Sequence, residues 1–155
     1  MSQVSIGNKV PHFESIATGD QRITLSSLKG KKVVIYFYPR DSTPGCTTEG
    51  QDFRDNHNKF KRANTVILGV SRDGIKSHEN FKAKQAFPFE LLSDKEETLC
   101  TLFDVIKEKM LYGKKHMGIE RSTFLIDEKG VLRTEWRKVK VAGHVEEVLA
   151  ATKAL

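Results

Sequence analysis

The chain has 155 residues, of which 38% are hydrophobic and 30% charged, a composition typical of soluble globular proteins. Its length fits a single domain spanning residues 1–155, and its longest apolar run, residues 33–38, is too short for a membrane span of roughly 20 residues. The net charge of +6 comes from basic residues interleaved with acidic ones, so the sequence predicts a solvated surface and no nucleic-acid partner.

The N-terminal segment and the two cysteines indicate in which cellular compartment the protein is expected. The chain does not open with a basic region followed by an apolar stretch, so no secretory signal is predicted. A chain of this length can bury enough surface to fold without disulfides, so Cys46 and Cys100 are not expected to form a structural scaffold. We therefore expect a cytoplasmic protein, because thiols stay reduced in the cytoplasm.

The first half of the chain predicts alternating strands and helices. Residues 13–29 are expected to form an N-terminal extension with short strands and a turn of helix near residues 25–28. Residues 33–38 (VVIYFY) are an unbroken run of β-branched and aromatic side chains, typical of a strand buried on both faces, and we expect them to form the central strand. The next segments are a predicted helix, strand and helix over residues 47–62, 65–71 and 75–85.

The second half continues this alternation and closes with a hairpin. A strand and a helix are predicted over residues 89–93 and 95–106, followed by a loop over residues 110–117 that is expected to border a pocket. Two strands and a final helix are predicted over residues 122–127, 131–136 and 141–155, and the turn residues 127–130 join the two strands. This order of elements predicts a three-layer α/β sandwich.

The segment that carries the candidate chemistry is YPRDSTPGCTTEG, residues 38–50, which joins the predicted central strand to the next helix. In open α/β sheets, ligands bind at the carboxyl ends of the strands. Cys46 falls in or just before the first helical turn, where free backbone N–H groups and the helix dipole favour an anion such as a thiolate. The sequence therefore predicts that Cys46 is an activated nucleophile.

The residues around Cys46 are suited to such a site. Thr43 can hydrogen-bond the sulfur or an oxygen beside it, and Pro39 and Pro44 stiffen the loop. Glu49 lies one helical turn after Cys46 and on the same side of the helix. Spacing alone leaves open the alternative that Cys46 is a small buried hydrophobic residue.

These residues carry a resemblance to a known family. Pro39, Thr43 and Cys46 match the active-site motif of the peroxiredoxins, and FYPRDSTPGCTTEG with GIERSTFLID (residues 118–127) resembles their Q-type branch, the bacterioferritin comigratory proteins. The similarity runs from about Gly7 to the end of the chain. It implies a thioredoxin-like fold with an N-terminal extension. It also implies a cofactor-free thiol peroxidase that reduces hydrogen peroxide and organic hydroperoxides in antioxidant defence.

The resemblance also implies roles for individual residues. Cys46 would be the peroxidatic cysteine, Thr43 its hydroxyl partner, Pro39 the residue that shields the pocket, and Arg121 the guanidinium that completes it. An arginine beside Cys46 would favour the thiolate by its charge, and its planar fork could hold both the sulfur and a peroxide oxygen. Two further residues are expected near the pocket, Gly45 and Glu49.

Without the Cys46 motif, Arg121 would be interpreted as an ordinary surface ion-pair partner of Glu120 or Glu128.

The chain departs from the family at the resolving cysteine. Many members of this branch carry one at the position of Gln51, and others carry it on the next helix, where residues 75–85 contain none. Cys100 lies among apolar residues of another predicted helix and could resolve Cys46 only if the two Cα atoms came within about 7 Å. We therefore expect Cys100 to be a buried thiol and the mechanism to use one cysteine. The external reductant would be thioredoxin, glutaredoxin or glutathione.

Two other functions remain open from the sequence. A thioredoxin-like disulfide oxidoreductase would share the fold but needs a CxxC motif, and Glu49 stands where its second cysteine would be. The other alternative is a non-catalytic, redox-sensing module whose basic surface binds an anionic partner. The simple C-terminal helix favours a monomer, and the scattered histidines predict no metal site.

Overall fold

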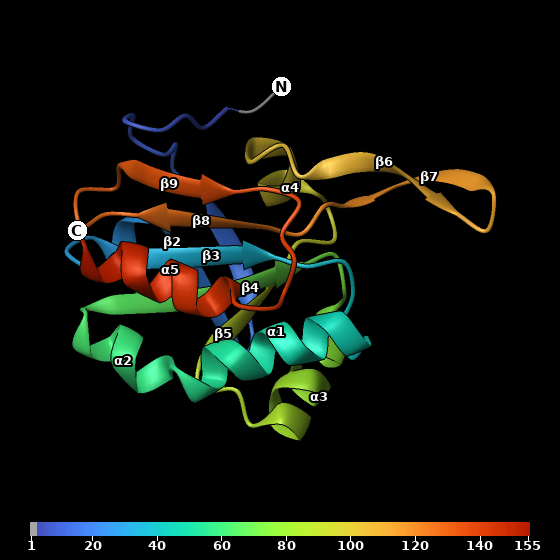
Figure 1. Ribbon diagram of the computed structural model, residues 1–155, viewed down its shortest axis with the longest axis horizontal. Coiled ribbons are helices and arrows are strands. Elements are labelled where there is room, and N and C mark those ends of the chain that lie inside the picture. Colours follow the sequence, from blue (N-terminus) through green and yellow to red (C-terminus); the bar gives the residue numbers. More distant parts are fainter. Residues whose placement is uncertain (1–2) are drawn as a thin grey trace.

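The computed structural model describes residues 3–155, and Figure 1 shows how their strands and helices are arranged. The strands are β1 (Glu14–Ala17), β2 (Gln21–Thr24), β3 (Lys32–Phe37), β4 (Thr65–Ser71), β5 (Glu90–Ser93), β6 (Ile106–Leu111), β7 (Lys114–Ile119), β8 (Ser122–Ile126) and β9 (Leu132–Trp136). The helices are η1 (Ser26–Leu28), α1 (Pro44–Asp55), α2 (His57–Arg62), α3 (Ile75–Gln85), α4 (Thr98–Leu102) and α5 (His144–Lys153). No helix in this part of the chain is long and apolar enough to cross a membrane.

Seven of the strands form one mixed sheet in the order β2-β1-β5-β4-β3-β8-β9. β3 pairs in parallel with β4, with Val34 opposite Ile67, and antiparallel with β8, with Val34 opposite Leu125. Every residue of β3 is buried, which explains the unbroken apolar run in its sequence. The strand predicted over residues 33–38 is therefore internal, although β4 and not β3 holds the middle position of the sheet.

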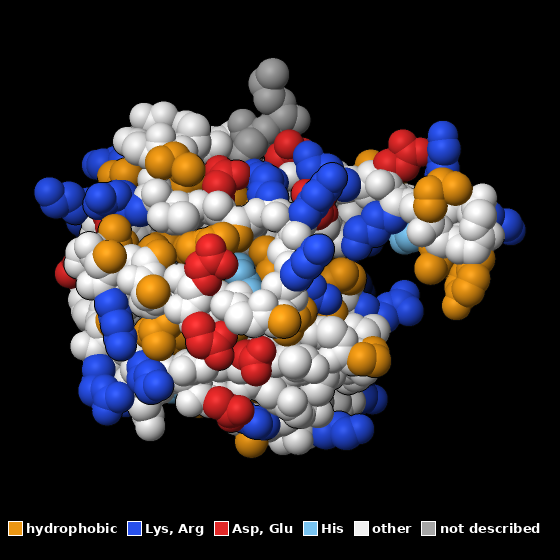
Figure 2. Space-filling view, viewed as in Figure 1, with side chains coloured by type: hydrophobic (Ala, Val, Ile, Leu, Met, Phe, Trp, Pro, Cys, Tyr) orange, Lys and Arg blue, Asp and Glu red, His pale blue; other side chains and the backbone are white. Residues whose placement is uncertain are grey.

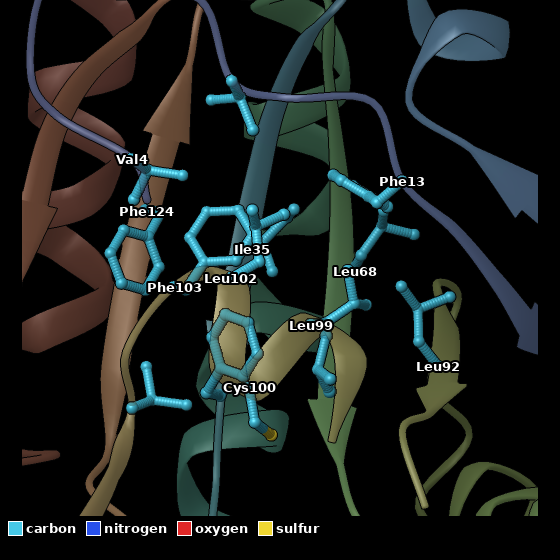
Figure 3. Close-up of a cluster of buried hydrophobic side chains, with 14 of the residues drawn as sticks. Val4, Phe13, Ile35, Leu68, Leu92, Leu99, Cys100, Leu102, Phe103 and Phe124 are labelled. Atoms are coloured by element: carbon cyan, nitrogen blue, oxygen red, sulfur yellow. The ribbon is translucent and has the colours of Figure 1, made fainter. Parts of the chain in front are cut away.

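The two faces of the sheet carry two separate hydrophobic cores. One packs Val34 and Tyr36 of β3 against the helices α1, α2, α3 and α5. The other packs Ile35 and Phe37 against α4 and the N-terminal segment, and Figure 3 shows Ile35 beside Phe103 in this second core. Successive β3 side chains point to opposite faces because a strand has a side-chain period of two. The result is the three-layer α/β sandwich that the sequence predicts.

Most of the predicted strands are confirmed. Those over residues 65–71, 89–93, 122–127 and 131–136 correspond to β4, β5, β8 and β9, and the N-terminal extension contains β1, β2 and η1. The predicted hairpin turn between β8 and β9 is held by Asp127, whose Oδ1 accepts hydrogen bonds from the backbone N–H groups of Lys129 and Val131.

Two of the predicted helices differ in extent, and a third has the predicted bounds. The helix predicted over residues 47–62 begins earlier, at Pro44, and is divided into α1 and α2 at Asn56, whose side-chain amide donates to the Asp52 carbonyl. The last helix begins at His144, since Gly143 before it has a left-handed φ of 75°. The helix predicted over residues 75–85 is confirmed as α3.

The prediction for residues 95–106 was wrong. Only the five-residue helix α4 forms there, and its first free backbone N–H groups, those of Leu99 and Cys100, donate to the Asp94 carboxylate. The chain turns away at Asp104, which has a left-handed φ of 54°. An aspartate tolerates this left-handed conformation better than most residues do, and the conformation prevents a helix from continuing to residue 106.

The loop expected over residues 110–117 is instead part of the hairpin formed by β6 and β7. Tyr112 and Gly113 close the hairpin with φ values of 51° and 75°, the pattern typical of a two-residue hairpin turn. The outer parts of both strands are largely exposed, so no hydrophobic alternation marks them in the sequence. In Figure 1 the hairpin extends away from the body of the protein.

Candidate active site

The candidate site lies at the carboxyl end of β3, where the loop of residues 38–43 leads into α1. Thr43 precedes the helix with an extended backbone, and Pro44 occupies the first turn, where its missing N–H costs no hydrogen bond. Cys46 is therefore the third residue of α1 and lies among the free N–H groups of its N-terminus. The cysteine is buried, with only 1% of its surface exposed.

Arg121 connects Cys46 to Glu49. Its Nη2 donates to Cys46 Sγ at 3.4 Å, and its Nη1 donates to Glu49 Oε1 at 2.7 Å. Arg121 lies between the end of β7 and the start of β8, which brings it next to α1 although it is far away in the sequence. A Cβ atom on Gly45 would lie 3.1 Å from Arg121 Nη2, so the glycine leaves room for this close approach. The structure thus brings together four of the residues singled out in the sequence.

Burial and the neighbouring charges shift the pKa values of Glu49 and Arg121 in opposite directions. Burial raises the pKa of Glu49 to about 7, although the nearby Arg121 charge and its hydrogen bond lower it. The second oxygen of Glu49, Oε2, is buried without a hydrogen-bond partner among the described residues. Burial alone would lower the pKa of Arg121, but Glu49 and Cys46 more than offset this effect and raise it. Arg121 therefore keeps its charge beside the sulfur.

Thr43 and Pro39 border the same loop. The Thr43 hydroxyl donates to the Arg40 carbonyl at 2.8 Å and not to the sulfur of Cys46. Since its single proton is used there, the lone pairs of Thr43 Oγ1 are available as acceptors. Pro39 is half-buried and follows Tyr38, whose backbone N–H donates to the Val70 carbonyl.

A buried hydrogen-bond network, which sequence reasoning missed, holds this loop from beneath. Asp41 accepts hydrogen bonds from the hydroxyls of Tyr38 at 2.6 Å and Ser77 at 2.8 Å. His78 Nδ1 lies 2.7 Å from Asp41 Oδ2, and its Nε2 lies 2.7 Å from the Leu92 carbonyl. A carbonyl only accepts, so Nε2 carries a proton, and the short contact at Nδ1 requires another proton between ring and carboxyl. The loop is thus tied to α3 and β5.

No motif in the sequence marks this network, because Asp41 and His78 are 37 residues apart. Asp73 extends it: its Oδ2 accepts from the Asp41 backbone N–H at 2.9 Å and from the Ser71 hydroxyl at 2.6 Å. Asp41, Asp73 and His78 offer ligand atoms within 4.8 Å of one another, a spacing that could suit a metal ion. Hydrogen bonds already occupy these atoms, so we interpret the cluster as a support for the loop.

Cys100 lies in a different environment. It is 0% exposed and belongs to the core on the opposite face of the sheet from Cys46, among the side chains shown in Figure 3. Burial raises the pKa of the Cys100 thiol well above its usual range, and the neighbouring Asp94 carboxylate raises it further. The sheet separates the two cysteines, so the structure does not bring them together.

Comparisons with known proteins identify the family of the chain. Residues 6–135 match the model of the AhpC/TSA family. The chain is 59% identical over 137 residues to Peroxiredoxin Bcp of Xanthomonas campestris, covering 88% of this chain and 86% of the relative. It is 52% identical over 150 residues to Peroxiredoxin Bcp of Bacillus subtilis, covering 97% and 96%.

The solved structures show the same relationship. A structure of the X. campestris bacterioferritin comigratory protein, described for its alkyl peroxide reduction activity, superposes with a TM-score of 0.88 at 56% identity. The match covers 92% of this chain and 90% of that one.

Proposed function

We propose a one-cysteine mechanism for this chain, with Cys46 as the peroxidatic nucleophile. The chain belongs to the AhpC/TSA family and is a peroxiredoxin, a thiol peroxidase. The observation that carries this proposal is the contact of Arg121 Nη2 with Cys46 Sγ at the N-terminus of α1. A fixed positive charge and free backbone N–H groups at the sulfur favour the thiolate, which is the nucleophilic form.

In the proposed reaction, the Cys46 thiolate attacks the hydroxyl oxygen of the peroxide, so that an S–O bond forms as the O–O bond breaks. Cys46 is oxidised to a sulfenic acid, and the leaving oxygen takes up a proton to become water or an alcohol. One external thiol then displaces water from the sulfenic acid to give a mixed disulfide. A second thiol releases reduced Cys46 and leaves an external disulfide.

The neighbouring residues would position the peroxide and stabilise the charge that develops. Arg121 can hold the peroxide oxygen next to the sulfur and stabilise the negative charge on the leaving oxygen. Glu49 orients Arg121 through its 2.7 Å ion pair, and Gly45 leaves room for that arginine. The free lone pairs of Thr43 can accept a hydrogen bond from the peroxide O–H, and Pro39 would shield the pocket from water.

Three features support the one-cysteine part of the proposal. Gln51 stands where many relatives carry a resolving cysteine, and its side chain bonds Gln85 at 2.9 Å. The helix α3 contains no cysteine. Cys100 lies on the other face of the sheet, and its raised pKa disfavours the thiolate needed to attack a sulfenic acid.

The remaining parts of the proposal concern substrates, partners and location. We propose hydrogen peroxide and organic hydroperoxides as substrates, supported by the alkyl peroxide reduction described for the X. campestris relative. Thioredoxin, glutaredoxin or glutathione would supply the external thiol. The enzyme would act as a monomer in the cytoplasm, where thiols stay reduced.

A steady-state peroxidase assay of Cys46→Ser and Cys100→Ser tests this function. Both substitutions replace a buried thiol by a hydroxyl, so they are matched controls for each other. We expect Cys46→Ser to abolish peroxide turnover with every thiol donor and Cys100→Ser to leave it largely intact. Wild-type activity in Cys46→Ser would overturn the proposed nucleophile, whereas loss of turnover in Cys100→Ser alone would overturn the one-cysteine mechanism.

A further inference from the structure

The hairpin β6–β7 is a surface that the proposed chemistry does not use. It forms a separate two-stranded sheet, and Figure 2 shows it projecting from the body of the protein with a recess beside it. Several large apolar side chains are exposed near its tip, and Tyr112 in the turn is 96% exposed. The exposed members are Met110, Leu111, Tyr112 and Met117. Exposed apolar side chains clustered on a projection are typical of surfaces that bind a partner.

The strand register separates the hairpin into two different faces. Lys109 lies opposite His116, and Leu111 lies opposite Lys114, so these side chains share one face. Lys107, opposite Gly118, belongs to the same face. The other face contains the one acidic residue of the hairpin strands, Glu108, and its neighbour Lys115 at 3.5 Å. One face of the hairpin strands therefore combines three lysines with an apolar side chain, and of these lysines Lys107 is paired with Asp104, just before β6, at 3.0 Å.

This basic face reaches the candidate active site at its base. Lys109 of β6 is half-buried, and burial together with the Arg121 charge lowers its pKa. β7 ends at Ile119, two residues before Arg121. Arg72 attaches the hairpin to the body by donating to the Met117 carbonyl at 3.4 Å. A molecule seated on the basic face would therefore have one end next to Cys46.

We propose that this basic face and the apolar tip of the hairpin form the docking surface for an acidic protein reductant that regenerates Cys46. The inference rests on the proposed one-cysteine function, which requires an external thiol at the oxidised sulfur. A strand of six residues spans about 20 Å, so a partner that contacts both Cys46 and the tip at Tyr112 must be a macromolecule. Glutathione is too small to use the tip. The lysines favour a partner with a negative surface, and the tip favours one with an apolar margin.

Lys114→Glu combined with Tyr112→Ser tests the docking surface. Both side chains are exposed and lie at the outer end of the hairpin, away from the body of the protein (Figure 1), so the substitutions should leave folding and the sulfur intact. The matched control is Lys129→Glu combined with Ile6→Ser, which likewise reverses the charge of one exposed lysine and removes one exposed apolar side chain, away from the hairpin. The probes are an acidic thioredoxin, glutathione and dithiothreitol, together with the rate of Cys46 oxidation by hydrogen peroxide in a single turnover.

We expect the hairpin variant to raise KM for thioredoxin roughly tenfold or more, and to lose much of the salt dependence of that step. Turnover with dithiothreitol and the single-turnover oxidation rate should match the wild type, and the control variant should behave like the wild type throughout. An unchanged KM for thioredoxin would overturn the docking surface. Equal slowing with dithiothreitol would also overturn it, because the hairpin would then affect the site itself.

Two further outcomes identify a different occupant. If glutathione sustains turnover, thioredoxin does not, and the hairpin variant slows the glutathione reaction, the proposal for a protein reductant is wrong. If the wild type is a dimer in solution and the hairpin variant is a monomer, the surface binds a second copy of the chain and the proposal is likewise overturned. Failure of the proposed function is separate, since wild-type Cys46 would then not be oxidised by peroxide at all.

Discussion

Cys46 and Cys100 are equally buried, yet charged groups of opposite sign lie beside their sulfur atoms. Cys46 lies at the N-terminus of α1 with the Arg121 guanidinium 3.4 Å from its sulfur. Cys100 lies in an apolar core beside the Asp94 carboxylate, and both burial and that charge raise the pKa of its thiol. The comparison teaches that burial alone does not decide whether a cysteine reacts. The sign of the nearest charge and the helix terminus decide it.

Removing the positive charge at Cys46 should have the largest effect. We expect Arg121→Met to lower kcat/KM for peroxide by roughly 100- to 1000-fold, because the substitution removes the donor to both sulfur and leaving oxygen. Arg121→Lys should recover little activity, since an ammonium cannot hold two atoms in one plane as the guanidinium does. Stopped-flow measurement of Cys46 oxidation checks both variants. A loss below threefold in Arg121→Met would show that the helix terminus alone activates the sulfur.

Breaking the network beneath the loop should have the next largest effect. Asp41→Asn leaves His78 facing an amide in place of a carboxylate, and we expect the peroxide rate to fall between roughly 10- and 100-fold as the loop loses its position. The free energy of unfolding should fall by about 2 kcal/mol, the usual cost of losing a buried hydrogen bond to a charged group. Denaturant titration and stopped-flow oxidation measure the two quantities.

Ser77→Ala is the milder comparison for that network. It removes one 2.8 Å hydrogen bond to Asp41 and leaves His78 in place, so about 1 kcal/mol of destabilisation is expected. If Asp41→Asn and Ser77→Ala changed the peroxide rate equally little, the network would stabilise the fold without positioning the loop.

The Glu49 carboxyl should make stability depend on pH. Its pKa is about 7 in the folded protein and near 4.3 in an unfolded chain, so the folded state holds a proton that the unfolded state loses first. The contribution of this group is therefore full below about pH 4.3 and is lost as the pH rises towards 7. In the wild type, the free energy of unfolding should therefore decline by on the order of 3 kcal/mol across that window. We expect Glu49→Gln to remove this decline, and denaturant titration at several pH values measures it. An unchanged slope would show that Glu49 is ionised throughout.

Cys100 should show the smallest response to a thiol reagent. In native protein, iodoacetamide should alkylate Cys46 quickly and leave Cys100 unmodified until the chain unfolds, because the thiolate reacts and the thiol does not. Peptide mapping after timed labelling measures the two rates. Equal labelling rates at both cysteines would remove the difference between the two environments.

The sequence predicts the sandwich well because its strands are marked by simple patterns. The run at residues 33–38 matches the fully buried strand β3, and the helix of residues 75–85 buries His78 and Phe81, which lie three residues apart on one face. The prediction of a helix over residues 95–106 was wrong because Asp94 caps the start of a short helix and the left-handed backbone at Asp104 ends it. Helix propensity does not reveal these two limits. The hairpin that follows carries almost no apolar alternation, since most of it lies in solvent.

The residues of the candidate site that belong to a sequence motif could be predicted, whereas those brought together only by packing could not. Cys46 and Thr43 are close together in the chain, and the resemblance supplied Arg121, which lies 75 residues after Cys46, just before the start of β8. Nothing in the sequence links Asp41 to His78, because the fold alone brings that loop and α3 together. The hydrogen bond of the Thr43 hydroxyl to the Arg40 carbonyl is likewise a detail of loop geometry.

Intact mass and peptide mapping after one equivalent of hydrogen peroxide test the central claim most directly. In the absence of added thiol, the account predicts that the protein gains one oxygen atom, located on Cys46 as a sulfenic acid, while Cys100 remains a free thiol. A loss of two hydrogens, with Cys46 and Cys100 joined in one cross-linked peptide, would contradict it.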